Sequence, residues 1–215
     1  MTTQQAALLS IDAILGLGPV VPVIVHDDPL TAAPLAQALI LGGVRVLEVT
    51  LRTPKALEVL ARMAEQPGAV PGAGTVLTAG QWAQARQAGA RFVVSPGLTP
   101  ELLEAAADFP DCPMLPGVVT PSEVMRAREA GLRHLKLFPA EPMRARELLP
   151  AYASVFGDVR FCPTGGIHPG IAPEYLALPN VACVGGSWLT PKAAVAAGDW
   201  AAITALAQAT LTLRG

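Results

Sequence analysis

Positive charge is scarce in this sequence, and its scarcity argues against several kinds of partner. Only three of the 215 residues are lysines, and neither lysine nor arginine occurs before Arg45. With 15 basic against 17 acidic residues the formal net charge is −2, so the chain lacks the basic surface that binds nucleic acids or anionic membranes. A secretory signal begins with a positively charged segment, so we expect the protein to be cytoplasmic.

Cysteines and long apolar runs are also few. The three cysteines are scattered in apolar surroundings, which is typical of buried reduced thiols and not of a disulfide framework. No stretch of about 18 apolar residues runs without Pro, Gly or a polar residue, so we expect no membrane-spanning helix. Hydrophobic residues nevertheless make up 52% of the chain, enough for one large core. Because no linker interrupts the composition, residues 1–215 are predicted to form a single domain.

Short apolar segments rich in β-branched residues recur along the chain. Their apolar character is nearly continuous, without in-and-out alternation, as in parallel strands that are covered on both faces. These segments lie at residues 20–25, 44–50, 69–74, 91–97, 114–118, 134–140, 160–166 and 181–186.

Helix signals separate the apolar segments. A Thr-Pro pair combines a hydroxyl N-cap with a proline suited to the first helical turn, and Gly at a helix end permits the left-handed conformation that stops it. The Thr-Pro pairs lie at 53–54, 99–100, 120–121 and 190–191, and the stop glycines are Gly43, Gly89 and Gly131.

The alternation of these signals predicts an α/β fold with parallel strands. We count eight strand-then-helix units, a leading helix near residues 4–15 and a closing helix near residues 199–212. An open doubly wound sheet would also satisfy this count. The even length of the units favours a closed (β/α)8 TIM barrel with an extra N-terminal helix.

One lysine stands in the middle of an apolar segment, LRHLKLFPAE at 132–141. Polar residues near the carboxyl ends of barrel strands face the active-site mouth, and Lys136 lies near such an end. Burial between Leu135 and Leu137 disfavours an ammonium ion, so part of the amine is expected to be neutral and nucleophilic. Such lysines form Schiff bases with carbonyl substrates. The alternative is a structural lysine in an ion pair inside the barrel.

Two more charged residues lie on or just after the segment 44–50. Glu48 is flanked by apolar residues, so we expect it to be a general acid or base, with a structural ion pair as the alternative. Arg52 can hold a small carboxylate with its planar fork, and its alternative role is a surface salt bridge. Thr75, which follows the next segment, could add a hydroxyl to the same anion.

Paired glycines follow the last two segments, in PTGGI at 163–167 and CVGGSW at 183–188. Backbone N–H groups of such turns can approach an anion, and phosphate sites recur after strands seven and eight of barrels. Ser187 would add a hydroxyl donor. The three histidines have no ligand spacing with cysteines or carboxylates, so we expect no metal site and no cofactor.

The motifs together resemble a known family. GGVRVLEVTLRT (42–53), GAGTV (72–76), SPGL (95–98), LKLFPAE (135–141), RFCPTGGI (160–167) and GGSWL (185–189) are similar, in this order, to the class I 2-keto-3-deoxy-6-phosphogluconate (KDPG) aldolases, which are also known as 4-hydroxy-2-oxoglutarate aldolases. The resemblance implies a (β/α)8 barrel, usually a homotrimer, that cleaves a phosphorylated keto sugar acid to pyruvate and glyceraldehyde 3-phosphate. A second substrate expected from the resemblance is 4-hydroxy-2-oxoglutarate, cleaved to pyruvate and glyoxylate.

The resemblance also implies a role for each site residue. Lys136 would be the Schiff-base lysine and Glu48 the proton shuttle, while Arg52 and Thr75 would hold the pyruvyl carboxylate. The remaining implied contacts are Thr164, which would orient the chemistry; Phe138 and Pro96 beside the substrate; and Gly165, Gly166, Gly185, Gly186 and Ser187 around the phosphate.

Two other functions remain open from the residues alone. One is a phosphosugar isomerase or epimerase of the same architecture, which would use paired acid and base groups without an imine. The other is a non-catalytic barrel that binds phosphorylated metabolites. The end of the first segment, Val25-His26-Asp27-Asp28, carries no strong cation for a phosphate, and whether His26 contributes to phosphate binding is left open.

Overall fold

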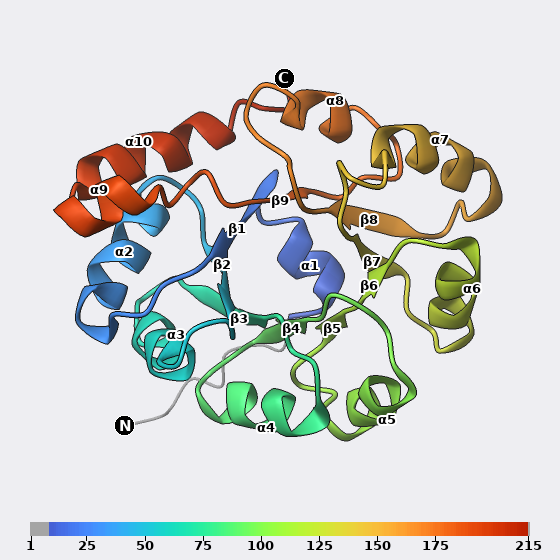
Figure 1. The fold of residues 1–215 in the computed structure, drawn as a ribbon, viewed down its shortest axis with the longest axis horizontal. Coiled ribbons are helices and arrows are strands. Elements are labelled where there is room, and N and C mark those ends of the chain that lie inside the picture. Colours follow the sequence, from blue (N-terminus) through green and yellow to red (C-terminus); the bar gives the residue numbers. More distant parts are fainter. Residues whose placement is uncertain (1–8, 215) are drawn as a thin grey trace.

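The computed structural model describes residues 9–214, which form a ring of parallel strands surrounded by helices (Figure 1). The strands are β1 (Val20–Ile24), β2 (Val46–Thr50), β3 (Val70–Gly74), β4 (Phe92–Val94), β5 (Met114–Leu115), β6 (Gly117–Val118), β7 (His134–Leu137), β8 (Arg160–Pro163) and β9 (Val184–Gly186). The helices are α1 (Ile11–Leu15), α2 (Pro29–Leu41), α3 (Ala56–Ala64), α4 (Ala79–Gln87), α5 (Pro100–Asp108), α6 (Pro121–Glu129), α7 (Ala145–Val155), α8 (Ala172–Leu176), α9 (Lys192–Ala197) and α10 (Trp200–Thr210).

The strands form a closed ring, in which regular strand pairing is interrupted at two places. Six strands pair in the order β5-β4-β3-β2-β1-β9, and three pair in the order β6-β7-β8. β5 and β6 are the two halves of the strand predicted at 114–118, and they are separated by Pro116, which has no N–H to donate to a ladder. Single bridges, Phe161 to Val181 and Thr164 to Gly185, join the last strands. The ring therefore has eight strand positions, which confirms the predicted barrel.

Several of the helix signals in the sequence are correct. The hydroxyls of Thr99 and Thr120 accept hydrogen bonds from backbone N–H groups in the first turns of α5 and α6. Gly43, Gly89 and Gly131 have left-handed φ angles of 88°, 97° and 83°. The closing helix is α10, as expected near residues 199–212.

Two predicted caps are wrong. Thr53 does not cap a helix, because its hydroxyl donates to the carbonyl of His26 at 2.9 Å and α3 begins only at Ala56. The N-cap of α9 is Pro191, with no side-chain cap, so Thr190 does not serve there either. Of the leading helix expected near 4–15, the part before residue 9 lies outside the described residues.

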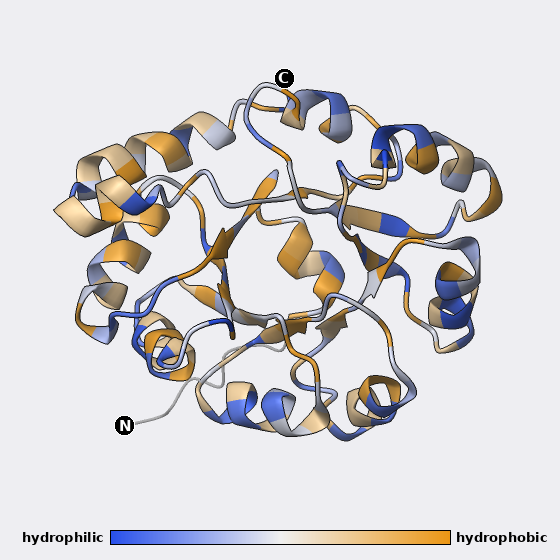
Figure 2. Cartoon of the chain, viewed as in Figure 1, coloured by the Kyte–Doolittle hydropathy of each residue, from blue (hydrophilic) through white to orange (hydrophobic). Residues whose placement is uncertain are grey.

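The amino end of the barrel is filled by α1, which lies within the ring of strands in Figure 1. Its Ile14 and Leu15 are buried together with interior strand residues such as Val46 and Phe92. Ser10 begins the helix by accepting a hydrogen bond from the N–H of Ala13. In Figure 2, α1 and the strands carry mostly apolar residues, whereas the outer helices mix apolar and polar ones. Helix α1 therefore closes the barrel opposite to the carboxyl ends of the strands.

The three cysteines are buried free thiols, as predicted. Burial raises the pKa of Cys112 to about 11. A hydrogen bond with Cys162 and burial raise the pKa of Cys183, inside the barrel. The thiols of Cys112 and Cys183 are therefore protonated and unreactive in the folded protein. None of the helices within residues 9–214 is both long and apolar enough to cross a membrane.

Candidate active site

A cavity of about 180 Å³ opens at the carboxyl ends of the strands. One water occupies about 30 Å³ of liquid, so the cavity holds a ligand of several heavy atoms. Seven predicted site residues and two others line it: Val23, Glu48, Thr50, Arg52, Thr75, Pro96, Lys136, Phe138 and Thr164. Lys136 and Arg52 give the cavity two cationic groups against the single carboxylate of Glu48, a balance that suits an anionic ligand.

Lys136 and Glu48 meet across the barrel. Lys136 on β7 and Glu48 on β2 occupy opposite sides of the ring, and they are only 6% and 3% exposed. Lys136 Nζ lies 3.5 Å from Glu48 Oε1, and Oε1 has no hydrogen-bond partner within residues 9–214. Lys136 Nζ also lies 5.1 Å from the centre of the Phe138 ring. A purely structural ion pair would be closed by further hydrogen bonds, whereas this pair faces a cavity.

The carboxylate of Glu48 occupies space that Gly74 leaves free. Glu48 pairs in register with Gly72 of β3, and Gly74 follows two residues later on the same face. A Cβ on Gly74 would lie 2.8 Å from Cγ and 2.9 Å from Cδ of Glu48. Glycine is thus required at this position for the observed orientation of Glu48. This requirement was not evident from the sequence.

Arg52 and Thr75 stand on neighbouring loops at the rim of the cavity. The guanidinium of Arg52 is exposed and makes no hydrogen bond or ion pair with any residue of the described chain, so the surface salt bridge is not formed. Thr75 has a φ of 60°, a left-handed conformation that costs a β-branched residue about 1–3 kcal/mol. Strain of this kind persists mainly at functional sites. Both side chains therefore remain available to a ligand.

Two threonine hydroxyls complete the polar wall. Thr164 Oγ1 donates to the carbonyl of Cys162 at 3.3 Å, and Thr50 Oγ1 donates to the carbonyl of Ile24 at 2.9 Å. Thr50 was missed in the sequence, although it lies two residues after Glu48 and so shares its face of the strand. Val23 was also missed, since an apolar residue within an apolar strand gives no signal.

The paired glycines lie beyond the cavity lining and differ in their geometry. Gly165 and Gly166 form a turn after β8 with left-handed φ angles of 106° and 81°. Gly185 and Gly186 are buried in β9 and allow close packing, because a Cβ on them would overlap the side chain of Thr164 or the ring of Trp188. Ser187, directly after β9, is exposed. The expected phosphate contacts thus comprise an open turn, a packed strand end and an exposed hydroxyl.

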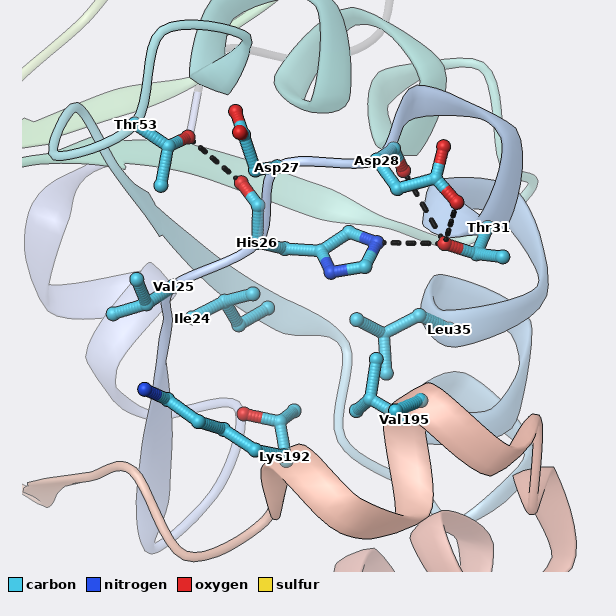
Figure 3. A pocket seen from close by; sticks show the side chains of 12 residues that line it. Ile24, Val25, His26, Asp27, Asp28, Thr31, Leu35, Thr53, Lys192 and Val195 are labelled. Atoms are coloured by element: carbon cyan, nitrogen blue, oxygen red, sulfur yellow. Dashed lines mark hydrogen bonds between the residues drawn. The ribbon is translucent and has the colours of Figure 1, made fainter.

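His26 belongs to a different cavity. A space of about 380 Å³ lies beside the end of β1, lined by residues of α2 and α9 (Figure 3). His26 Nε2 is 2.9 Å from Thr31 Oγ1, and burial lowers the pKa of the ring. The histidine therefore does not line the cavity around Lys136. No group of three or more His, Cys, Asp or Glu side chains within residues 9–214 is arranged to hold a metal ion.

The chain is similar to known aldolases along nearly its whole length. The family model for KDPG and KHG aldolase matches residues 11–206. The KHG/KDPG aldolase of Escherichia coli is 50% identical over 200 residues, which make up 93% of each chain. The range that the family model matches includes every residue that lines the cavity around Lys136.

Two solved structures share the fold closely. The KDPG aldolase of Zymomonas mobilis with 3-phosphoglycerate has a TM-score of 0.91 and 49% identity, covering 97% of this chain and 98% of that one. The KDPG aldolase of Legionella pneumophila, with pyruvate captured as a covalent carbinolamine intermediate, has a TM-score of 0.92 and 46% identity, covering 95% of this chain and 99% of that one.

Proposed function

The chain belongs to the KDPG and KHG aldolase family, and from this premise we propose that Lys136 forms the Schiff base of a class I aldolase reaction. The reaction cleaves 2-dehydro-3-deoxy-6-phosphogluconate to pyruvate and glyceraldehyde 3-phosphate. Cleavage of 4-hydroxy-2-oxoglutarate to pyruvate and glyoxylate is a second reaction of the same site. The single observation that carries the assignment of Lys136 is its buried amine, 3.5 Å from a buried carboxylate in a cavity.

The pair of Lys136 and Glu48 supports the first half of the mechanism. When the Lys136 ammonium passes one proton to Glu48, the pair becomes neutral and the amine becomes nucleophilic. The amine attacks C2 of the keto acid and forms a carbinolamine. Glu48 gives its proton to the carbinolamine hydroxyl, which leaves as water, so that a protonated imine remains and Glu48 is again a carboxylate. This cation accepts the electron pair of the C3–C4 bond when that bond breaks.

Glu48 then serves as the acid and base of the second half. Its carboxylate removes the proton of the C4 hydroxyl, directly or through a water, and the aldehyde departs as C3–C4 breaks. The same group returns the proton to C3 of the enamine. Hydrolysis of the imine releases pyruvate and restores the amine of Lys136. The Oε1 atom, which lacks a hydrogen-bond partner, supports this role because it has capacity to accept the proton.

The remaining site residues bind and orient the substrate in this proposal. Arg52 and Thr75 hold the carboxylate next to the imine, while Pro96 and Phe138 form the apolar wall. Thr164 orients the departing aldehyde. The phosphate is held beyond the cavity by the backbone and hydroxyl of the two glycine segments: Gly165, Gly166, Gly185, Gly186 and Ser187.

Reductive trapping tests this assignment. Borohydride added with pyruvate should leave a stable adduct on Lys136 and inactivate the enzyme, and mass spectrometry of peptides should locate the adduct. Lys136→Arg should give no adduct and no pyruvate release in an assay coupled to lactate dehydrogenase. An adduct on Lys55 or Lys192, or turnover by Lys136→Arg, would overturn the assignment of Lys136. Absence of both the adduct and pyruvate release in the wild type would favour an isomerase or a silent binding protein.

We also propose that the protein is a cytoplasmic homotrimer and that residues 1–215 act as one domain, as the resemblance implies. Sedimentation equilibrium measures the first part, since a trimer has three times the 22.2 kDa mass of the chain. A monomeric mass at micromolar concentration would contradict the trimer while leaving the chemistry of Lys136 untouched.

A further inference from the structure

One cluster of charged residues, which is partly exposed, has no part in the mechanism above. Glu141 lies in the turn after β7, and both of its carboxylate oxygens accept hydrogen bonds from residues of the flanking helices. Tyr175 Oη of α8 donates to Oε1 at 2.5 Å, and Arg146 of α7 donates to Oε2 at 3.1 Å. Arg146 also donates a hydrogen bond to Glu174 Oε2 at 2.5 Å, and its guanidinium lies 5.9 Å from the centre of the Tyr175 ring. This cluster therefore fixes Glu141 relative to both helices.

The turn of Gly165 and Gly166 rests directly on Glu141. The N–H of Glu141 donates to the carbonyl of Gly165 at 3.0 Å, and the N–H of Ala140 donates to the carbonyl of Thr164 at 2.8 Å. A Cβ on Gly166 would lie 2.7 Å from Cβ and 3.0 Å from Cγ of Glu141. No gap separates the turn from this side chain, so a change in the position of Glu141 displaces the turn.

Tyr175 is the most deeply buried residue of the cluster. Its side chain is fully buried, at 0% exposure, whereas Glu174 and Arg146 are partly in solvent. Burial and the nearby Glu141 carboxylate raise the pKa of Tyr175, so the phenol keeps its proton and remains a donor. A short hydrogen bond from a neutral donor to a carboxylate is among the stronger ones in proteins. The hydrogen bond from Tyr175 therefore fixes Oε1 of Glu141 from the buried side of the cluster.

We propose that Glu141, held by Tyr175, is a positioning residue that sets the Gly165–Gly166 turn to receive the phosphate of the substrate. This inference rests on the proposed function, in which that turn contacts the phosphate. Lys136, Glu48 and Arg52 lie in a separate cavity lining that includes neither Glu141 nor Tyr175. Loss of the hydrogen bond between Tyr175 and Glu141 therefore weakens binding of the phosphorylated part of the substrate and leaves the formation of the pyruvate imine intact.

The test compares Tyr175→Phe, which removes only the hydroxyl, with Tyr152→Phe. The control removes the hydroxyl of Tyr152 on α7, which donates to the carbonyl of Val119 at 2.6 Å, and leaves both hydrogen bonds of Glu141 in place. For Tyr175→Phe we expect the KM for 2-dehydro-3-deoxy-6-phosphogluconate to rise about tenfold, and inhibition by inorganic phosphate to weaken by a similar factor. The pyruvate concentration that half-saturates borohydride inactivation should change less than about twofold. Tyr152→Phe should match the wild type in all three measurements.

Each of the following outcomes would contradict a specific step of the proposal. An unchanged KM in Tyr175→Phe, or an equal loss in the pyruvate measurement, would overturn the positioning role of Tyr175 and Glu141. If inorganic phosphate does not inhibit the wild type, the proposed phosphate site itself is wrong and this inference falls with it. Should Tyr175→Phe fail to fold, Glu141→Gln, which removes the charge at nearly constant volume, carries the same expectations.

Discussion

The orientation of Glu48 depends on the missing side chain of Gly74, and this dependence can be tested by Gly74→Ala. Gly74 does not have a left-handed φ, so an alanine is compatible with the backbone. The added Cβ would lie 2.8 Å from Cγ and 2.9 Å from Cδ of Glu48, and closer still to Oε1. Carbon atoms pack best at separations of about 3.5 Å or more, so the carboxylate has to move by roughly 0.7 Å.

A displacement of this size is enough to impair proton transfer. A misplacement of about 1 Å in a catalytic group can cost about 100-fold in rate, equal to roughly 2.7 kcal/mol of activation free energy. We therefore expect kcat for aldol cleavage to fall about 100-fold in Gly74→Ala. Imine formation should persist, because the new methyl group meets Glu48 and not Lys136. Insertion of a methyl group into a packed interior also lowers the free energy of unfolding by about 1–3 kcal/mol.

Three measurements separate these effects. Pyruvate release measures kcat, borohydride trapping with pyruvate measures the imine, and urea unfolding measures stability. Gly80→Ala in α4 is the matched control, because the nearest atom to its added Cβ, Thr78 Oγ1, is 3.8 Å away. Wild-type turnover in Gly74→Ala would refute the reasoning, as would a loss of trapping as large as the loss of turnover.

Three further results are expected. Glu48→Gln removes the acid and base, so kcat should fall by about 10²–10⁴ and the pyruvate adduct should form more slowly, because no carboxylate accepts the proton of Lys136; near-normal turnover would mean that another group moves the proton. Burial alone would raise the pKa of Glu123, but hydrogen bonds from backbone N–H groups at the start of α6 outweigh burial and lower this pKa. The stability that the carboxylate contributes is therefore present above its ordinary pKa of about 4.3 and is lost as the pH falls. Glu123→Gln should thus be less stable than the wild type at pH 7 in urea unfolding, with a gap that narrows by pH 4, and a constant gap would contradict this. Finally, the three cysteines should react with a disulfide reagent only slowly until guanidinium unfolds the chain, because all three are buried and burial raises the pKa of Cys112 to about 11; rapid reaction of the native protein would show that the thiols are accessible.

Much of the site was predictable because ionisable residues rarely occur inside apolar strands. Lys136 and Glu48 could be found in this way, and the rule that barrel sites lie at the carboxyl ends of strands brought in Arg52 and Thr75. Their relative distances were not predictable from composition or periodicity. The contact of 3.5 Å between Lys136 and Glu48 depends on the closure of the barrel, which brings opposite strands together.

The local errors have a common cause, namely that tertiary contacts override local signals. Thr53 has the residue type of a helix cap, but its hydroxyl bonds to the loop after β1. The strand predicted at 114–118 is interrupted at Pro116, which the pattern of apolar residues does not reveal. Gly74 and Gly185 look like ordinary turn or strand glycines in the sequence. Their importance depends on side chains of neighbouring strands that approach them only after folding.

Helix α1 leaves the interior of the barrel open only at the carboxyl ends of the strands. With Ile14 and Leu15 filling the amino end, molecules reach Lys136 through the mouth at the carboxyl ends and must leave by the same route. In the proposed reaction the half that carries the phosphate lies nearer this mouth, and the pyruvyl half is tethered further in. Departure is therefore sequential, with the aldehyde first and pyruvate last, and in the reverse direction pyruvate has to enter before its partner.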